Sequence, residues 1–137
     1  MRLNSDEIFY LNEFSSASNA NARDCIIEEK VVAFLVKKDA MGKAIGKNAE
    51  TVKKLRQKLR RNIEIFEYDD DVQGFIKKAL YNIKIDAINI AERNGKKQAI
   101  LQLDSENKRK LLNNLARVKR IKAFAKRDYS IDDVRTR

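Results

Sequence analysis

The sequence of 137 residues contains no histidine, no proline and no tryptophan, and it has only one cysteine and four glycines. Without histidine, a Ser-His-Asp triad, a Cys-His dyad and a histidine metal site are all excluded. The single cysteine, Cys25, excludes an internal disulfide and a zinc site made of several cysteines. We therefore expect no cofactor, no bound metal and no enzymatic activity.

Long apolar segments are also missing. The longest apolar run, from Val31 to Val36, has six residues, which is far too few to span a bilayer. The first residues lack the apolar core of a signal peptide. A lone cysteine fits a reducing compartment. The sequence thus predicts a cytoplasmic protein that does not enter a membrane.

Charge is plentiful and unevenly placed. The sequence has thirty Lys and Arg residues and twenty Asp and Glu residues, so the formal net charge is +10. Residues 37–61 hold 10 basic and 2 acidic groups, and residues 104–137 hold 11 and 5. The basic charge is therefore concentrated in two segments, which favours a polyanionic partner.

Apolar periodicity predicts an α+β chain in which one order of elements, α-β-β-α-α-β, occurs twice. The first set is predicted as helices at 5–14, 38–45 and 49–59, with strands at 25–27, 31–36 and 62–68. In the second set, Asp69 to Asp71 start a helix whose apolar face runs from Phe75 to Ile83. The turn pair Asn94-Gly95 then joins strands at 87–93 and 97–103, followed by helices at 106–112 and 115–126 and a strand at 131–135.

An internal repeat agrees with this order. At an offset of 66 residues, identical residues include Ala33/Ala99, Val52/Val118, Lys53/Lys119 and Ile65/Ile131. We predict two domains, 1–69 and 70–137, each with helices packed on a small three-stranded mixed sheet. No Pro- or Ser-rich linker separates them, so rigid tandem packing is expected.

One short stretch combines the features of a phosphate clamp. Gly46 lies between two predicted helices, where backbone N–H groups and the helix dipole favour an anion. A glycine there removes the side chain that would keep a sugar-phosphate backbone away. Lys43, Lys47 and Lys53 add positive charge around the same point. Asn48 is expected to cap the helix that follows.

Ile45-Gly46-Lys47-Asn48-Ala49, followed by Val52, resembles the GXXG loop of a KH domain. The tandem arrangement, Gly42 to Asn48 and the closing Ile131 to Val134 are similar to archaeal NusA-like transcription termination/antitermination proteins with two type II KH domains. The resemblance implies that the loop and an adjoining apolar groove bind single-stranded RNA, and specifically a nascent transcript. It also implies RNA polymerase as a partner, although the polymerase-binding and S1-type regions of bacterial relatives have no counterpart here.

The two copies depart from the pattern differently. In the first, Ala49 replaces the second glycine, and we expect it to sit comfortably in the first helical turn. In the second copy, the four positions are Leu112-Asn113-Asn114-Leu115, with neither glycine. That degenerate loop should be a poor clamp, so the second copy is expected to act as scaffold or to bind through a secondary basic patch of Arg117, Lys119 and Arg120.

Alternatives remain at this stage. A related RNA-binding role, in ribosome assembly or other RNA metabolism, fits the same motifs. Duplex DNA binding by a helix-turn-helix at 40–59 is disfavoured by strands on both sides. A protein-interaction adaptor is the third alternative. The predicted RNA-binding residues are Lys43, Ile45, Gly46, Lys47, Asn48, Ala49, Val52 and Lys53.

Overall fold

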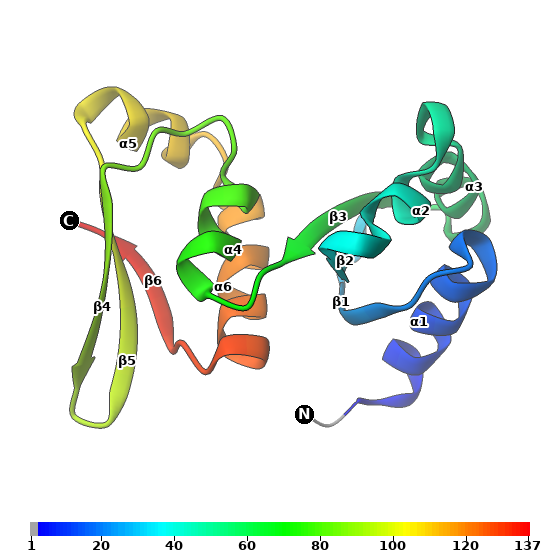
Figure 1. Cartoon of the computed structure of the whole chain (residues 1–137), viewed down its shortest axis with the longest axis horizontal. Helices are drawn as coiled ribbons and strands as arrows, with labels where there is room; N and C mark the ends of the chain where they lie inside the picture. The colour runs from blue at the N-terminus through cyan, green and yellow to red at the C-terminus, as the bar shows by residue number, and fades with distance from the viewer. Residues whose placement is uncertain (1–2) are drawn as a thin grey trace. The chain divides into compact units, whose positions relative to one another are not determined.

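The structure is a computed structural model that describes residues 3–137, and its contacts divide into two compact units. The first unit ends at Asp69 and the second runs from Asp70 to Arg137. Each contains helices beside a three-stranded sheet (Figure 1). The predicted α+β class with two small mixed sheets is confirmed.

The first unit is built around a central strand. The sheet order is β1-β2-β3, with β2 antiparallel to β1 and parallel to β3. A parallel pair needs a crossover connection, and two helices supply it here. The elements are α1 (Ser5–Ser18), β1 (Ala22–Ile27), β2 (Val31–Lys37), α2 (Met41–Ile45), α3 (Glu50–Leu59) and β3 (Asn62–Tyr68), with 3₁₀ turns at Lys38–Ala40 and Lys47–Ala49.

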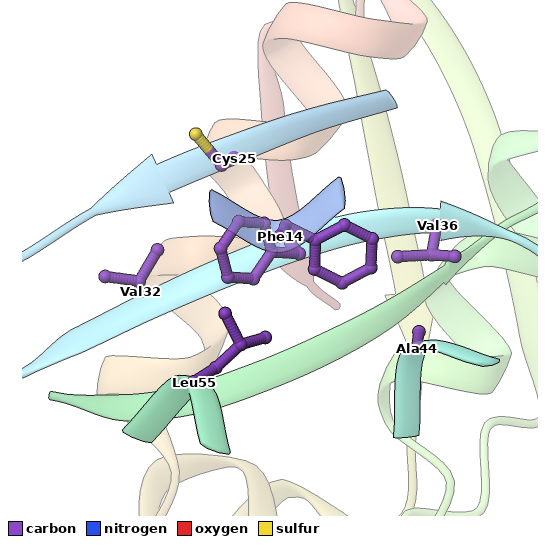
Figure 2. Close-up of a cluster of buried hydrophobic side chains, with 7 residues drawn as sticks. Phe14, Cys25, Val32, Val36, Ala44 and Leu55 are labelled. Carbon is purple, nitrogen blue, oxygen red and sulfur yellow. The ribbon is translucent and has the colours of Figure 1, made fainter. Parts of the chain in front are cut away.

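The core of this unit joins every layer. Side chains from α1, β1, β2, α2 and α3 converge on one apolar cluster (Figure 2). Strand β2 is buried from Val32 to Val36, as expected of a central strand. The cluster is Phe14, Cys25, Val32, Phe34, Val36, Ala44 and Leu55, all fully buried. Helix α2 is thereby fixed against the sheet by Ala44, and α3 by Leu55.

Helix α1 differs from its predicted form. Asn4 caps it: its side chain accepts from the Glu7 amide, and the Glu7 side chain accepts from the Asn4 amide. Within the helix, Phe14 is buried, whereas Ile8 is 47% exposed. The helix also continues past Phe14 to Ser18.

The second unit repeats the topology. Its sheet order is β4-β5-β6, antiparallel and then parallel. Asn94 and Gly95 have φ values of 54° and 78°, the left-handed pair expected of a two-residue hairpin turn. The elements are α4 (Val72–Ala79), β4 (Ala87–Arg93), β5 (Lys96–Gln102), α5 (Ser105–Leu112), α6 (Leu115–Tyr129) and β6 (Asp133–Thr136).

The repeat offset changes inside the second unit. Phe34 pairs with Ile65 in the first sheet, but its equivalent Ile100 pairs with Arg135. The reason is that α6 continues one turn further than α3. The predicted match of Ile65 with Ile131 is therefore wrong, because Ile131 lies buried before β6 rather than in it.

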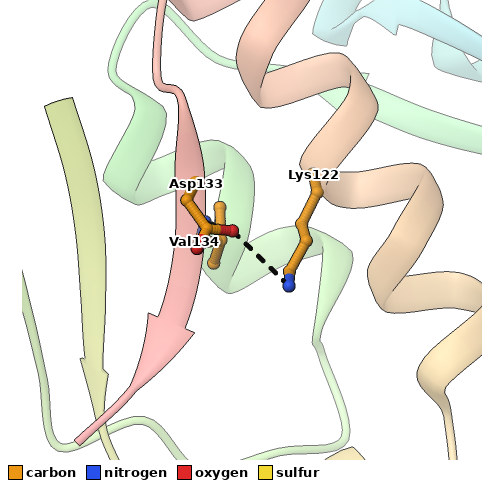
Figure 3. A network of polar contacts seen from close by, with 3 residues as sticks. All are labelled: Lys122, Asp133 and Val134. Atoms are coloured by element: carbon orange, nitrogen blue, oxygen red, sulfur yellow. Dashed lines mark hydrogen bonds and ion pairs between the residues drawn. The ribbon is translucent and has the colours of Figure 1, made fainter. Parts of the chain in front are cut away.

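Helix α6 also contacts the last strand, through a residue one turn before its extra turn. Lys122 Nζ lies 3.5 Å from Asp133 Oδ1 at the start of β6 (Figure 3). Asp133 Oδ1 also accepts from the Val134 amide at 2.9 Å. Among the described residues, no helix is long and apolar enough to cross a membrane.

Candidate nucleic-acid interface

The loop between α2 and α3 has an uncommon backbone. Gly46 has φ 79° and ψ 166°, a region that is essentially restricted to glycine. Asn48 and Ala49 follow in the left-handed region, with φ of 56° and 59°. Three of the four loop residues thus have positive φ, which turns the chain sharply between the two helices.

Gly46 also lies very close to the start of α3. A Cβ atom at this position would stand 2.6 Å from Thr51 Oγ1 and 2.9 Å from the Thr51 backbone nitrogen. Thr51 is buried, so neither group can move away freely. Glycine is therefore required here by conformation and by space.

Two expectations about the loop are wrong. Asn48 does not cap α3, because the residue at the cap position is Ala49, and that cap has no side-chain hydrogen bond. Ala49 is not in a helical conformation either. Its left-handed φ costs an L-residue with a Cβ roughly 1–2 kcal/mol, a cost that glycine avoids.

Several loop amides already have partners. The Gly46 amide donates to the Gly42 carbonyl at 2.8 Å, and the Ala49 amide donates to the Gly46 carbonyl at 3.1 Å. The Glu50 amide donates to the Lys47 carbonyl. In this conformation, the amides of Ala49 and Glu50 therefore donate within the loop and not outward.

The side chains around the loop form a cationic rim beside a small apolar edge. Lys43, Lys47 and Lys53 are all exposed. Ile45, the last residue of α2, is 39% exposed, and Val52, in the first turn of α3, is partly buried. Glu50 lies 3.7 Å from Lys54, one turn along the same helix. The loop thus presents cations, backbone and an apolar edge together.

The corresponding loop of the second unit has another conformation. Asn113 is in the right-handed helical region, with φ −78°, and Asn114 has φ −127° and ψ 35°. The Asn114 amide donates to the Leu111 carbonyl and its side chain to the Lys110 carbonyl. Leu112 and Leu115 are 64% and 59% exposed. This loop continues the helical path and presents leucines where the first presents glycine and alanine.

The start of α5, which leads into this second loop, is capped by Asp104. The Asn107 backbone and side-chain amides donate to its carboxylate at 2.8 and 2.9 Å. These bonds lower the pKa of Asp104 below its ordinary value. Asp104 thus stabilises the start of α5 as its N-cap.

The secondary basic patch of the second unit is not assembled as predicted. Arg120 is buried, at 7% exposure, and it has interactions within the protein. Arg117 Nε donates to the Ala79 carbonyl at 3.0 Å. Among the three, Lys119 alone is exposed. Arg117 thus connects α6 to the end of α4, and the buried Arg120 is not a surface cation.

Thr51 is the site residue that the sequence reasoning missed. The signal for it lay in the repeat: within the best-matched stretch, Thr51 corresponds to Arg117, just as Gly46 corresponds to Leu112. The two positions differ together because they touch in the first unit. A small residue at each position permits the close turn.

The structure weakens the helix-turn-helix alternative further. Helix α2 has five residues, and α3 packs through Leu55 into the core beneath the sheet. Duplex readers of that class instead use two full helices in a mainly helical setting. Among residues 3–137, no group of three or more Cys, Asp or Glu residues is placed to hold a metal ion.

Comparison with known proteins gives a consistent family. A family model described as KH domain matches residues 9–92. A "Probable transcription termination protein NusA" of Methanocaldococcus jannaschii is 35% identical over 88 residues, which are 64% of this chain and 48% of the relative. A protein of that name from Halobacterium salinarum is 25% identical over 98% of this chain and 96% of its own.

A solved structure agrees over the full length. The crystal structure of the protein APE1850 superimposes with a TM-score of 0.88 at 30% identity, covering 98% of this chain and 100% of the other. By contrast, the chain spans about half the length of the relatives from Methanocaldococcus jannaschii and Methanococcus vannielii.

Proposed function

The chain belongs to the KH domain family, and from this premise we propose that its first unit binds single-stranded RNA through the loop at Gly46 to Ala49. KH domains hold about four backbone nucleotides on such a loop. The observation that carries the proposal is the contact between Gly46 and Thr51, which lets the backbone turn without a side chain in the way. The cationic rim then meets a phosphate.

Within the loop, the proposal assigns separate tasks. Because the amides of Ala49 and Glu50 have internal partners, we assign phosphate contact to the amides of Lys47 and Asn48. Lys43, Lys47 and Lys53 neutralise phosphate charge, and their exposed side chains are free to follow the RNA. Ile45 and Val52 offer the apolar edge for bases.

The biological role that fits this binding is transcription termination or antitermination, acting on the nascent transcript. Support comes from the relatives of three archaeal genera that carry the name of a transcription termination protein. The role is one of binding, and it needs no catalytic group. RNA polymerase is a further proposed partner, with no surface assigned to it.

The test measures binding of single-stranded RNA, single-stranded DNA and duplex DNA to the full chain. We expect single-stranded RNA to bind best, and Lys47→Asp/Asn48→Asp to weaken it at least tenfold, because negative charge is placed at the clamp. Aspartate tolerates the left-handed conformation of Asn48, so the loop should keep its shape. Unchanged RNA affinity in this variant, or preference for duplex DNA, would contradict the proposal.

A matched control uses the second unit. Asn113→Asp/Asn114→Asp changes the equivalent loop positions. Adding Arg135→Gln lowers the net charge by three units in total, the same change that Lys47→Asp/Asn48→Asp makes. We expect about twofold weaker binding or less from this control. A loss as large as that of the first-loop variant would show that net charge, not the loop, determines affinity.

A further inference from the structure

A second cationic site lies at the other end of α3 from the loop. There, the turn between β1 and β2 and the start of β3 enclose a surface pocket of about 400 Å³. The pocket is lined by Glu29, Lys30, Arg56, Arg60, Arg61 and Asn62. Four cations and one carboxylate therefore surround one space, within the first unit alone.

Backbone geometry creates the pocket. Helix α3 ends when Arg60 takes a left-handed conformation, with φ 55°, and its amide donates to the Arg56 carbonyl. The next turn brings in the other wall, because the Asn62 amide donates to the Lys30 carbonyl at 2.8 Å. Lys30 thus lines the same pocket as Arg56 and Arg60, which lie more than twenty residues later in the sequence.

Three of the four cations are available to a ligand. Arg61 is used internally, since its Nη1 donates to the Tyr10 hydroxyl at 2.6 Å and its guanidinium lies over the Tyr10 ring. Lys30, Arg56 and Arg60 are exposed, and within residues 3–137 none of the three has an ion pair. Like charges that share a pocket repel, and a bound anion relieves that repulsion.

The helix dipole explains only part of this arrangement. Cations are favourable at a helix C-terminus, which accounts for Arg56 and Arg60. It does not account for Lys30, which comes from a strand turn. Nor does it explain why the second copy keeps a basic residue at each equivalent position, as Lys96, Lys122, Lys126 and Arg127.

The second unit holds its equivalent charges in a different arrangement. Helix α6 continues to Tyr129, so Lys126 and Arg127 lie within its last turn, whereas Arg60 and Arg61 follow the last residue of α3. Lys122 is paired with Asp133 (Figure 3). The first unit alone ends its helix so that the arginines flank the strand turn.

We propose that Lys30, Arg56 and Arg60 bind a backbone phosphate of single-stranded RNA that extends beyond the nucleotides held by the loop. This inference rests on the proposed RNA binding of the first unit. RNA is favoured over another polyanion because loop and pocket lie at the two ends of one helix. Ten residues of α3 separate them by about 15 Å, a distance that a strand of a few nucleotides covers.

The test compares RNA of twelve and of four nucleotides. Arg56→Gln/Arg60→Gln is expected to weaken binding of the twelve-nucleotide RNA by about 3- to 10-fold and to reduce its salt dependence by about 0.7 per lost phosphate contact. Binding of the four-nucleotide RNA, which the loop alone can hold, should stay the same. Arg56 and Arg60 are exposed, so their substitution should change stability little. Thermal unfolding checks that the variant is folded.

Controls separate this proposal from general charge effects and from the loop itself. Arg135→Gln/Arg137→Gln removes the same charge from the end of the chain and should weaken the long RNA less than twofold. Arg56→Lys/Arg60→Lys should retain most of the affinity. No loss in the glutamine variant, a loss equal to that of the control, or an equal loss on both RNA lengths overturns the pocket. A failure of the loop proposal is distinguished by a separate result, because Lys47→Asp/Asn48→Asp would then bind RNA as tightly as the unchanged protein.

Discussion

The two helix-loop-helix segments of this chain occupy equivalent places in units of the same topology, yet their loops differ in conformation. The first loop has positive φ at Gly46, Asn48 and Ala49, whereas Asn113 and Asn114 of the second have negative φ. Both segments are basic. The comparison teaches that charge persists between the copies more readily than the geometry that brings an anion close.

The difference arises from one contact between neighbouring helices. In the first unit, Gly46 and Thr51 approach so closely that no Cβ fits between them. In the second, Leu112 is 64% exposed, and Arg117 reaches away to the Ala79 carbonyl. The first loop is thus shaped for access to its backbone, and the second for connecting two helices.

The strongest expected effect breaks the first loop alone. Gly46→Ala should lower the free energy of unfolding by about 1–3 kcal/mol from backbone strain, with a further cost from the contact with Thr51. RNA affinity should fall at least tenfold with it. Leu112→Ala, at the equivalent exposed position, should change stability by about 0.5 kcal/mol or less. Chemical denaturation of both variants checks this, and equal losses would remove the distinction between the loops.

Substitution by glycine at the last position of each loop should change the free energy of unfolding less, and in opposite directions. Ala49→Gly removes a left-handed alanine and should raise the free energy of unfolding by about 1 kcal/mol, while leaving RNA binding unchanged or stronger. Leu115→Gly, in the first turn of α6, should lower it by as much as about 1 kcal/mol, because glycine weakens a helix. Denaturation curves test both. Destabilisation by Ala49→Gly would show that the alanine methyl makes a favourable contact.

Much of the fold could be predicted because apolar periodicity and turn residues are strong local signals. Strand β3 has the predicted bounds, Asn62–Tyr68, and Asn94-Gly95 forms the predicted turn. Helix α1 was predicted too short because the residues after Phe14 have little apolar periodicity. At that end, the hydroxyls of Ser15 and Ser18 donate to the carbonyls of Leu11 and Phe14.

The site was predicted less completely, because its geometry depends on contacts that residue type does not reveal. Alanine favours helices, so the sequence predicts a helical conformation for Ala49. In the structure Ala49 is left-handed, in a loop where Gly46 lies directly against Thr51. A basic run looks like an exposed helix face, so Arg120 was assigned to a surface patch although it is buried. The pocket at Arg56 and Arg60 likewise depends on where α3 ends.

The central claim is that the first loop holds an RNA backbone and the second does not. Amide resonances of the ¹⁵N-labelled chain, followed by NMR during titration with a four-nucleotide single-stranded RNA, test it most directly. The account predicts the largest shifts at Lys47 and Asn48, with little change at Asn113 and Asn114. Shifts of similar size in both loops, or shifts confined to the second, would contradict it.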